Sequence, residues 1–234
     1  GTSHSAEVRP NILFILADNW RWPTAGALGD PMARTPYFDR VVREGVLFTH
    51  TFNPVPSCSP TRASILTGKN AHELGERANL WSGFPKDTPV VTQLLRDASY
   101  RIGYSGKPWA PGNFETSGWK ENPVGPKFSS FTDFHAKRED GRPFFFWLGN
   151  TDTATRAGKM DFLSEAENAG LESSQVSIPP ELPDCNEVRQ DLLNYYGGVS
   201  KLDQEAGRAI ALLEKSGGLA IARTVCGPAG GLCL

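Results

Sequence analysis

Nearly uninterrupted hydrophobic runs mark the predicted strands of this chain. Residues 11–17 and 142–149 lack the alternation of a half-exposed strand, which is typical of central strands covered on both faces. Residues 100–105 and 46–52 are shorter apolar segments that we also interpret as strands. Residues 113–142 are rich in glycine, proline, serine and charge, so we expect a surface loop there.

Other segments space their hydrophobic residues three to four positions apart, which is the period of an amphipathic helix. Residues 35–44 begin with a capping threonine and a proline, and residues 88–98 follow with the same spacing. The longest pattern covers residues 187–215 and predicts one long helix, with Gly197 and Gly198 as candidates for a kink. The residues expected to face inward are Phe38, Val41 and Val42 in the first helix and Val91, Leu94 and Leu95 in the second.

The most informative stretch for chemistry is residues 58–68, Cys-Ser-Pro-Thr-Arg-Ala-Ser-Ile-Leu-Thr-Gly. Pro60 suits the first turn of a helix, and Gly68 can close that helix, so Cys58 lies just before a helix N-terminus. If Arg62 folds back, a guanidinium, backbone N–H groups and the helix dipole converge on Cys58, which suits a tetrahedral anion beside a nucleophile. The alternative is that Cys58 is a small buried residue, the usual fate of a lone cysteine.

Polar residues follow two of the predicted strands. Asp18 and Asn19 come directly after the strand at 11–17, where open α/β sheets bind their ligands. Asp18 can equally serve as a helix cap or a turn residue. Lys107 follows the strand at 100–105, and a lysine in a loop is most often exposed to solvent.

The pattern Cys-x-Pro-x-Arg resembles the signature of the type I sulfatases, which depend on formylglycine. Residues 35–52 also resemble a longer stretch of that family, and the resemblance covers residues 9–217. It implies an alkaline phosphatase-like α/β fold, with a mostly parallel central sheet flanked by helices and the site at the strand carboxyl ends. It also implies hydrolysis of sulfate esters, and the residues around Trp109 are similar to sulfatases that act on glycans, especially glucosamine-type units.

The same resemblance implies roles for individual residues. Cys58 is the precursor of formylglycine, whose hydrate attacks sulfur, while Arg62 and Lys107 hold the sulfate oxygens. Asp18 and Asn19, together with position 58, are the implied ligands of a calcium ion; an amide oxygen can replace the second carboxylate of the family. The implied partners are a sulfated small molecule or glycan and the maturation enzyme that generates formylglycine.

Substrate contacts are expected from two further residues. His72 lies in the loop at 69–85, and Trp109 stands where the family often has a histidine. Tryptophan rings offer stacking faces to a sugar, although core packing explains any one of them as well. The tryptophans considered for stacking are Trp20, Trp22, Trp81 and Trp109.

Two segments depart from the family pattern. Residues 150–156 lack the family's histidine, and residues 218–234 show neither the strand pattern nor the Asp-Asn-Gly ligands that follow the long helix in relatives. We therefore expect a truncated catalytic domain over residues 1–217 and an atypical tail over residues 218–234, produced by a shift of reading frame near Gly218. Because calcium takes about six to eight oxygen ligands, we expect little or no turnover.

Composition and charge exclude several classes of protein. A chain of 234 residues with 39% hydrophobic residues and a net charge of -2 describes a globular domain without a basic surface for nucleic acid. No apolar run is long enough to span a bilayer, and four scattered cysteines predict neither a disulfide scaffold nor a zinc site. The first residues lack a signal-peptide pattern, which is compatible with a mature start after cleavage. We expect a periplasmic or secreted protein.

Two other functions are compatible with the same residues. A non-catalytic protein would bind sulfated glycans with Cys58 unmodified. A phosphate-ester hydrolase of the same superfamily would more naturally carry serine or threonine at position 58, so the cysteine disfavours it.

Overall fold

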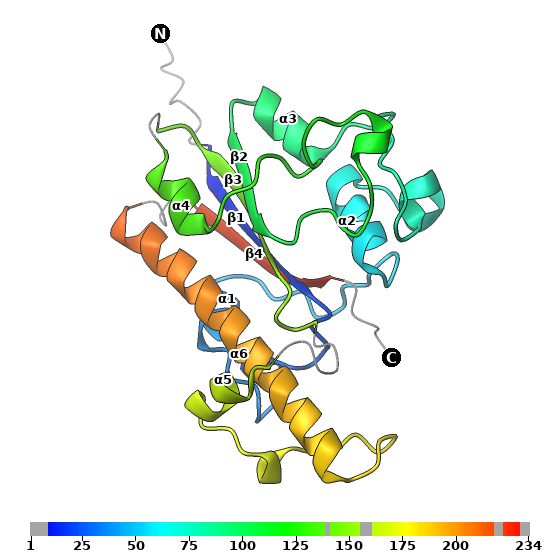
Figure 1. The fold of residues 1–234 in the computed structure, drawn as a ribbon. Coiled ribbons are helices and arrows are strands. Elements are labelled where there is room, and N and C mark those ends of the chain that lie inside the picture. The colour runs from blue at the N-terminus through cyan, green and yellow to red at the C-terminus, as the bar shows by residue number, and fades with distance from the viewer. Residues whose placement is uncertain (1–8, 139–140, 155–160, 218–221, 230–234) are drawn as a thin grey trace.

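A parallel sheet forms the centre of the fold in the computed structural model, which describes residues 9–138, 141–154, 161–217 and 222–229. The described residues form a four-stranded sheet in the order β2-β3-β1-β4, and every neighbouring pair is parallel (Figure 1). This arrangement confirms the predicted α/β fold. The strands are β1 (Asn11–Asp18), β2 (Arg101–Gly106), β3 (Phe144–Asn150) and β4 (Ala222–Ala229).

Helices cover both faces of this sheet (Figure 1). On one face, α6 packs over Leu13 of β1 and Phe146 of β3, together with α1 and α4. On the other face, α2 and α3 pack over Leu16 and Trp147. Helix α5 lies against α6. The α-helices are α1 (Pro36–Glu44), α2 (Cys58–Thr67), α3 (Val91–Asp97), α4 (Phe131–Ala136), α5 (Leu163–Asn168) and α6 (Asn186–Lys215). Short 3₁₀ helices lie at Gly26–Leu28, Ala71–Glu73, Gly75–Ala78, Glu115–Ser117 and Ser173–Gln175. Within the described ranges, no helix combines the length and the apolar character that crossing a membrane requires.

Helix α6 runs through its two adjacent glycines without a break. A Cβ at Gly197 would collide with the backbone oxygen of Phe162, and one at Gly198 would collide with the backbone oxygen of Asp152. The glycines therefore let two other segments approach the helix axis closely. This close approach brings the residues after β3 against the middle of α6.

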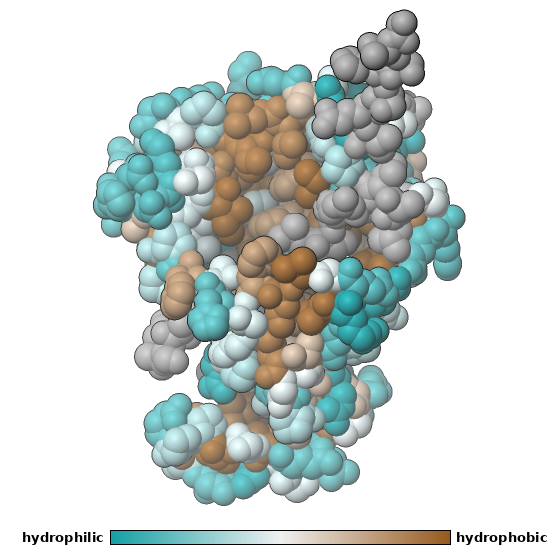
Figure 2. Space-filling view, turned by 180° about the vertical axis from the view of Figure 1, so that it is seen from behind, coloured by the Kyte–Doolittle hydropathy of each residue, from teal (hydrophilic) through white to brown (hydrophobic). Residues whose placement is uncertain are grey.

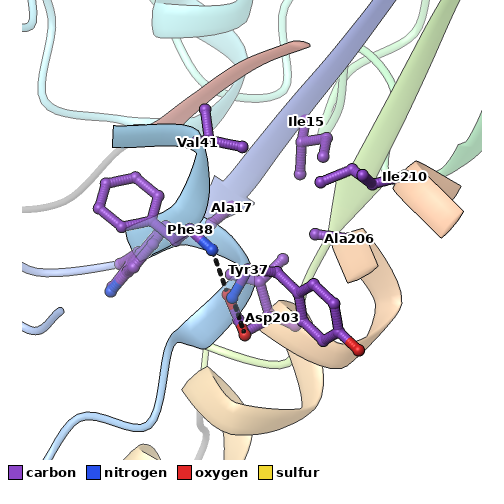
Figure 3. Close-up of a pocket in the computed structure, with 10 residues that line it drawn as sticks. Ile15, Ala17, Tyr37, Phe38, Val41, Asp203, Ala206 and Ile210 are labelled. Atoms are coloured by element: carbon purple, nitrogen blue, oxygen red, sulfur yellow. Dashed lines mark hydrogen bonds between the residues drawn. The ribbon is translucent and has the colours of Figure 1, made fainter. Parts of the chain in front are cut away.

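Asp203 joins α6 to the start of α1. Its carboxylate accepts hydrogen bonds from the backbone N–H groups of Tyr37, at 3.0 Å, and Phe38, at 2.8 Å (Figure 3). These are donors that the first turn of a helix leaves unpaired. Burial raises the pKa of Asp203 to about 6, against the opposing effect of the two N–H groups.

Residues 46–52 form no strand, so this prediction was wrong. Val46, Phe48 and Phe52 are exposed, Phe52 by 83%, and no strand of the described part pairs with this segment. An extended segment needs a neighbour for its backbone hydrogen bonds, which local sequence cannot reveal. Figure 2 shows broad hydrophobic areas on the back of the molecule.

Other local predictions also need correction. Helix α4 lies within the predicted loop at 113–142, because Phe131 and Phe134 are buried in the core. Leu94 of α3 is exposed instead of facing inward, while Val91 and Leu95 pack against the core.

The tail contains a strand that the sequence pattern did not predict. Strand β4 pairs with β1 along its whole length, from Asn11 opposite Ala222 to Asp18 opposite Ala229. An open edge of β1 would present unpaired backbone groups, and β4 satisfies them through its main chain, whatever side chains it carries. The other residues of the predicted tail lie outside the described ranges.

Candidate active site

Asp18 is the centre of a charged cluster at the carboxyl end of β1. The residue is buried, with 2% of its surface exposed. Its Oδ1 accepts a hydrogen bond from Nη2 of Arg62 at 3.3 Å, and its Oδ2 accepts one from Nζ of Lys107 at 2.5 Å. The structure thus brings together three residues that are 44 and 89 positions apart along the chain.

Cys58 reaches the same carboxylate from the start of α2. Its Sγ lies 3.7 Å from Oδ2 of Asp18, and the thiol is half-buried and free of any disulfide. The helix begins at Cys58 itself, two residues earlier than Pro60 suggested, and Gly68 closes it with a φ of 69°. Cys58 therefore belongs to the first helical turn, where the backbone N–H groups favour an anion.

Arg62 is fully buried and acts as an internal brace. Its Nη1 donates to the carbonyl oxygens of Lys107, at 2.8 Å, and Pro108, at 3.0 Å, while its Nε has no hydrogen-bond partner among the described residues. Burial lowers the pKa of Arg62, and the carboxylate of Asp18 opposes that effect. The guanidinium thus fixes both Asp18 and the loop that carries Lys107, and solvent does not reach it.

Lys107 is positioned by the turn that ends β2. Gly106 has a φ of +68°, and a Cβ there would collide with the carbonyl of Gly149, so glycine alone fits this place. The N–H of Lys107 donates to that same carbonyl at 2.8 Å. The side chain of Lys107 is 15% exposed, so its ammonium is the charged group of the cluster best placed to meet a ligand from solvent.

The described residues do not fit a calcium ion. Asp18 is the one carboxylate of this cluster, both of its oxygens already face cations, and no group of three or more acidic, histidine or cysteine ligands occurs among the described residues. Asn19 is exposed, in a left-handed conformation with φ 59°. Calcium takes about six to eight oxygens, so the described residues supply only a small part of the set.

Of the three predicted substrate-binding residues, Lys107 joins the cluster, whereas Trp109 and His72 do not. Trp109 is 1% exposed and packs edge-on against Phe84 in the core, so its ring offers no stacking face. His72 is exposed and lies beyond the far end of α2, a helix of ten residues and therefore about 15 Å long. Of the other tryptophans considered for stacking, Trp20 is buried, and Trp22 and Trp81 are exposed.

Two residues near the cluster were not predicted as site residues from the sequence. The hydroxyl of Thr153 donates to the backbone oxygen of Asp18, which ties the segment after β3 to the end of β1. Asn150 donates to the carboxylates of Asp152, at 2.8 Å, and Glu205, at 2.9 Å. The available signal was the run of polar residues directly after a buried strand, which marks a ligand-binding edge in parallel sheets.

Comparison with known proteins gives a family for this arrangement. The Sulfatase family model matches residues 10–220. An ulvan-active sulfatase of Formosa agariphila is 25% identical over 255 residues, covering 89% of this chain and 41% of the relative. The N-acetylgalactosamine-6-sulfatase of Homo sapiens is 34% identical over 110 residues, covering 42% of this chain and 21% of the relative. The chain thus spans less than half the length of these curated relatives.

Solved structures agree on the fold. One match is a structure from work on the metabolism of multiple glycosaminoglycans by Bacteroides thetaiotaomicron. It has a TM-score of 0.76 and 17% identity, over 94% of this chain and 61% of that one. A structure in complex with its substrate D-glucosamine-2-N,6-O-disulfate matches with a TM-score of 0.64 and 18% identity, over 94% and 65% of the two chains. With its alkaline phosphatase-like fold and a family match over nearly its whole length, the chain belongs to the sulfatase family.

Proposed function

We propose that this chain carries the nucleophile and the sulfate-binding groups of a sulfuric ester hydrolase that acts on sulfated glycans. The observation that carries the proposal is the convergence of Cys58, Arg62 and Lys107 on Asp18 at the first turn of α2. The names of the relatives support a glycan substrate, and one structural neighbour binds a sulfated glucosamine.

Cys58 fits the position of the family's modified residue. It is unpaired and half-buried, and it faces a charged cluster at a helix N-terminus. Formylglycine at this position, formed by a maturation enzyme, would supply a hydrated aldehyde as the nucleophile toward sulfur. Conversion to the aldehyde removes the thiol next to Asp18 and leaves the other contacts of the cluster in place.

Lys107, the first turn of α2 and Arg62 have separate roles in binding the anion. Lys107 can turn its ammonium from Asp18 to a sulfate oxygen, because its head is partly exposed and its stem is flexible. The N–H groups at the start of α2 provide further donors. Arg62 holds Asp18 and the Lys107 loop in place, so its role is positioning.

A second candidate is binding without efficient turnover. The family generally uses a divalent metal, whereas the described residues supply a single carboxylate that already faces two cations. An oxoanion site built from Lys107 and a helix N-terminus does not require the metal. We therefore propose that this chain, taken by itself, binds sulfate esters and hydrolyses them slowly.

Coexpression with a formylglycine-generating enzyme tests the assignment of the nucleophile. Purified chain is treated with an aminooxy probe that labels aldehydes, and the peptide that contains Cys58 is examined by mass spectrometry. Label is expected on the parent chain and on the control Cys185→Ala, and none on Cys58→Ala. A parent chain that stays unlabelled would contradict the assignment, and rapid calcium-dependent release of sulfate from glucosamine 2-N,6-O-disulfate would contradict the incomplete metal set.

A further inference from the structure

A polar cleft lies beside the cluster, on the other side of the sheet. It has a volume of about 290 Å³ and is formed by the ends of β2 and β3, the segment after β3, and one side of α6. Its lining includes Asn150, Asp152, Lys201, Glu205 and Arg208. None of these residues has a role in the proposed chemistry at Cys58.

The register of the sheet fixes where the cleft lies relative to Asp18. Asn150 is opposite Ala17 in the pairing of β1 with β3, one residue before Asp18. Successive side chains of a strand point to opposite faces, so Asp18 faces α2 while Asn150 faces α6. The contacts agree, because Asp18 binds Arg62 of α2 and Asn150 binds Glu205 of α6. Both sites therefore lie at the carboxyl ends of two neighbouring strands, which are roughly 4.8 Å apart, and on opposite faces of the sheet.

The inner wall of the cleft is a set of fixed hydrogen-bond acceptors. The amide of Asn150, itself buried, donates to one oxygen each of Asp152 and Glu205, and its Oδ1 accepts from the backbone N–H of Asp152. These bonds hold both carboxylates in place and leave them with free acceptor capacity. Carboxylates held in this way suit the hydroxyl groups of a sugar.

The outer wall carries positive charge. The Nζ of Lys201 lies 3.5 Å from Oδ1 of Asp152 and also stacks over the ring of Phe162. Arg208, two turns further along α6, is exposed and has no ion pair or hydrogen bond to another described residue. A guanidinium binds a carboxylate through two parallel hydrogen bonds, so Arg208 suits a planar carboxylate.

We propose that this cleft binds one carboxylate-bearing sugar unit, of the uronate type, in the glycan whose sulfate ester occupies the cluster. The proposal rests on the proposed function for the identity of the glycan. Asp152 and Glu205 accept hydroxyl protons, and Arg208 binds the carboxylate. The volume lies at the lower limit of small-molecule pockets, about 300 Å³, which suits one sugar unit.

Titration calorimetry with methyl β-D-glucuronide tests the proposal on the intact chain. Arg208→Ala should weaken binding by about fivefold or more, since a charge-assisted contact is lost. The control Arg43→Ala removes another exposed arginine, on α1, and should leave the affinity unchanged. Methyl β-D-glucoside, which lacks the carboxylate, should bind at least fivefold more weakly than the glucuronide. Thermal melting of each variant checks that it is folded.

Two results would overturn the proposal. One is equal affinity of the parent chain and Arg208→Ala for the glucuronide, and the other is equal affinity of the parent chain for glucuronide and glucoside. Inorganic sulfate, titrated in parallel, reports on the cluster. A parent chain that does not bind sulfate but binds glucuronide in an Arg208-dependent way would contradict the proposed function and support the proposed sugar site. The failure of one proposal is therefore distinguishable from the failure of the other.

Discussion

Replacing Asp18 by asparagine tests how the charged cluster contributes to stability. The substitution keeps the size of the side chain and removes its charge, so Arg62 remains buried without a counter-ion. Its Nη1 still donates to the carbonyls of Lys107 and Pro108, but carbonyl dipoles do not neutralise the guanidinium. Asp18→Asn should therefore destabilise the fold.

The magnitude follows from the burial of the two partners. Removing one partner of a buried ion pair costs about 3–5 kcal/mol, because the other charge stays uncompensated. The amide oxygen of asparagine still accepts one hydrogen bond, and Lys107, being 15% exposed, can turn toward water, so the lower limit applies. We expect a loss of about 3 kcal/mol in the free energy of unfolding, which lowers the melting temperature by roughly 6–12 °C in a chain of this size.

Urea unfolding followed by circular dichroism measures this loss, with Asp191→Asn on the exposed side of α6 as the control. The double variant Asp18→Asn with Arg62→Met should be more stable than Asp18→Asn alone, because it removes the uncompensated buried charge of Arg62. A single variant as stable as the parent chain would refute the reasoning. A double variant less stable than the single one would refute it as well.

Two further predictions concern α1 and the turn that carries Lys107. The raised pKa of Asp203 means that the folded state holds a proton that the unfolded state has released between about pH 4 and pH 6, so stability falls as pH rises through this window. Relative to Asp203→Asn, the parent chain should lose roughly 2 kcal/mol between pH 4 and pH 7 in urea unfolding, and a difference that does not change with pH would contradict this. Gly106→Ala should cost about 2 kcal/mol more than Gly118→Ala, because both glycines have positive φ but only Gly106 would push a Cβ into a backbone carbonyl. Equal losses for the two variants in thermal melting would show that the contact with Gly149 is unimportant.

Local patterns predicted the elements that depend on local information. The uninterrupted apolar runs gave β1 and β3, the three-to-four spacing gave α6, and the proline and glycine around Arg62 gave α2. Pairing between distant segments is not local, which is why residues 46–52 were predicted as a strand and β4 was not.

The candidate site was predictable only in part. Asp18 and Lys107 each follow a strand, and parallel strands bring their carboxyl ends to one edge, so their meeting follows from the sequence pattern. The burial of Trp109 and the distance of His72 depend on how loops fold back on the sheet, and no spacing encodes that. Asn150 and Glu205 meet because two glycines let the segment after β3 approach α6, which is a packing effect.

The most direct test of the account is the affinity of this chain for inorganic sulfate, measured by calorimetry in EDTA and again with added calcium. We predict binding in both conditions, weakened by about fivefold or more in Lys107→Met and unchanged in Lys137→Met, which removes an exposed lysine at the C-terminal end of α4. Binding that appears only with calcium would contradict the account, and so would binding that is indifferent to Lys107→Met.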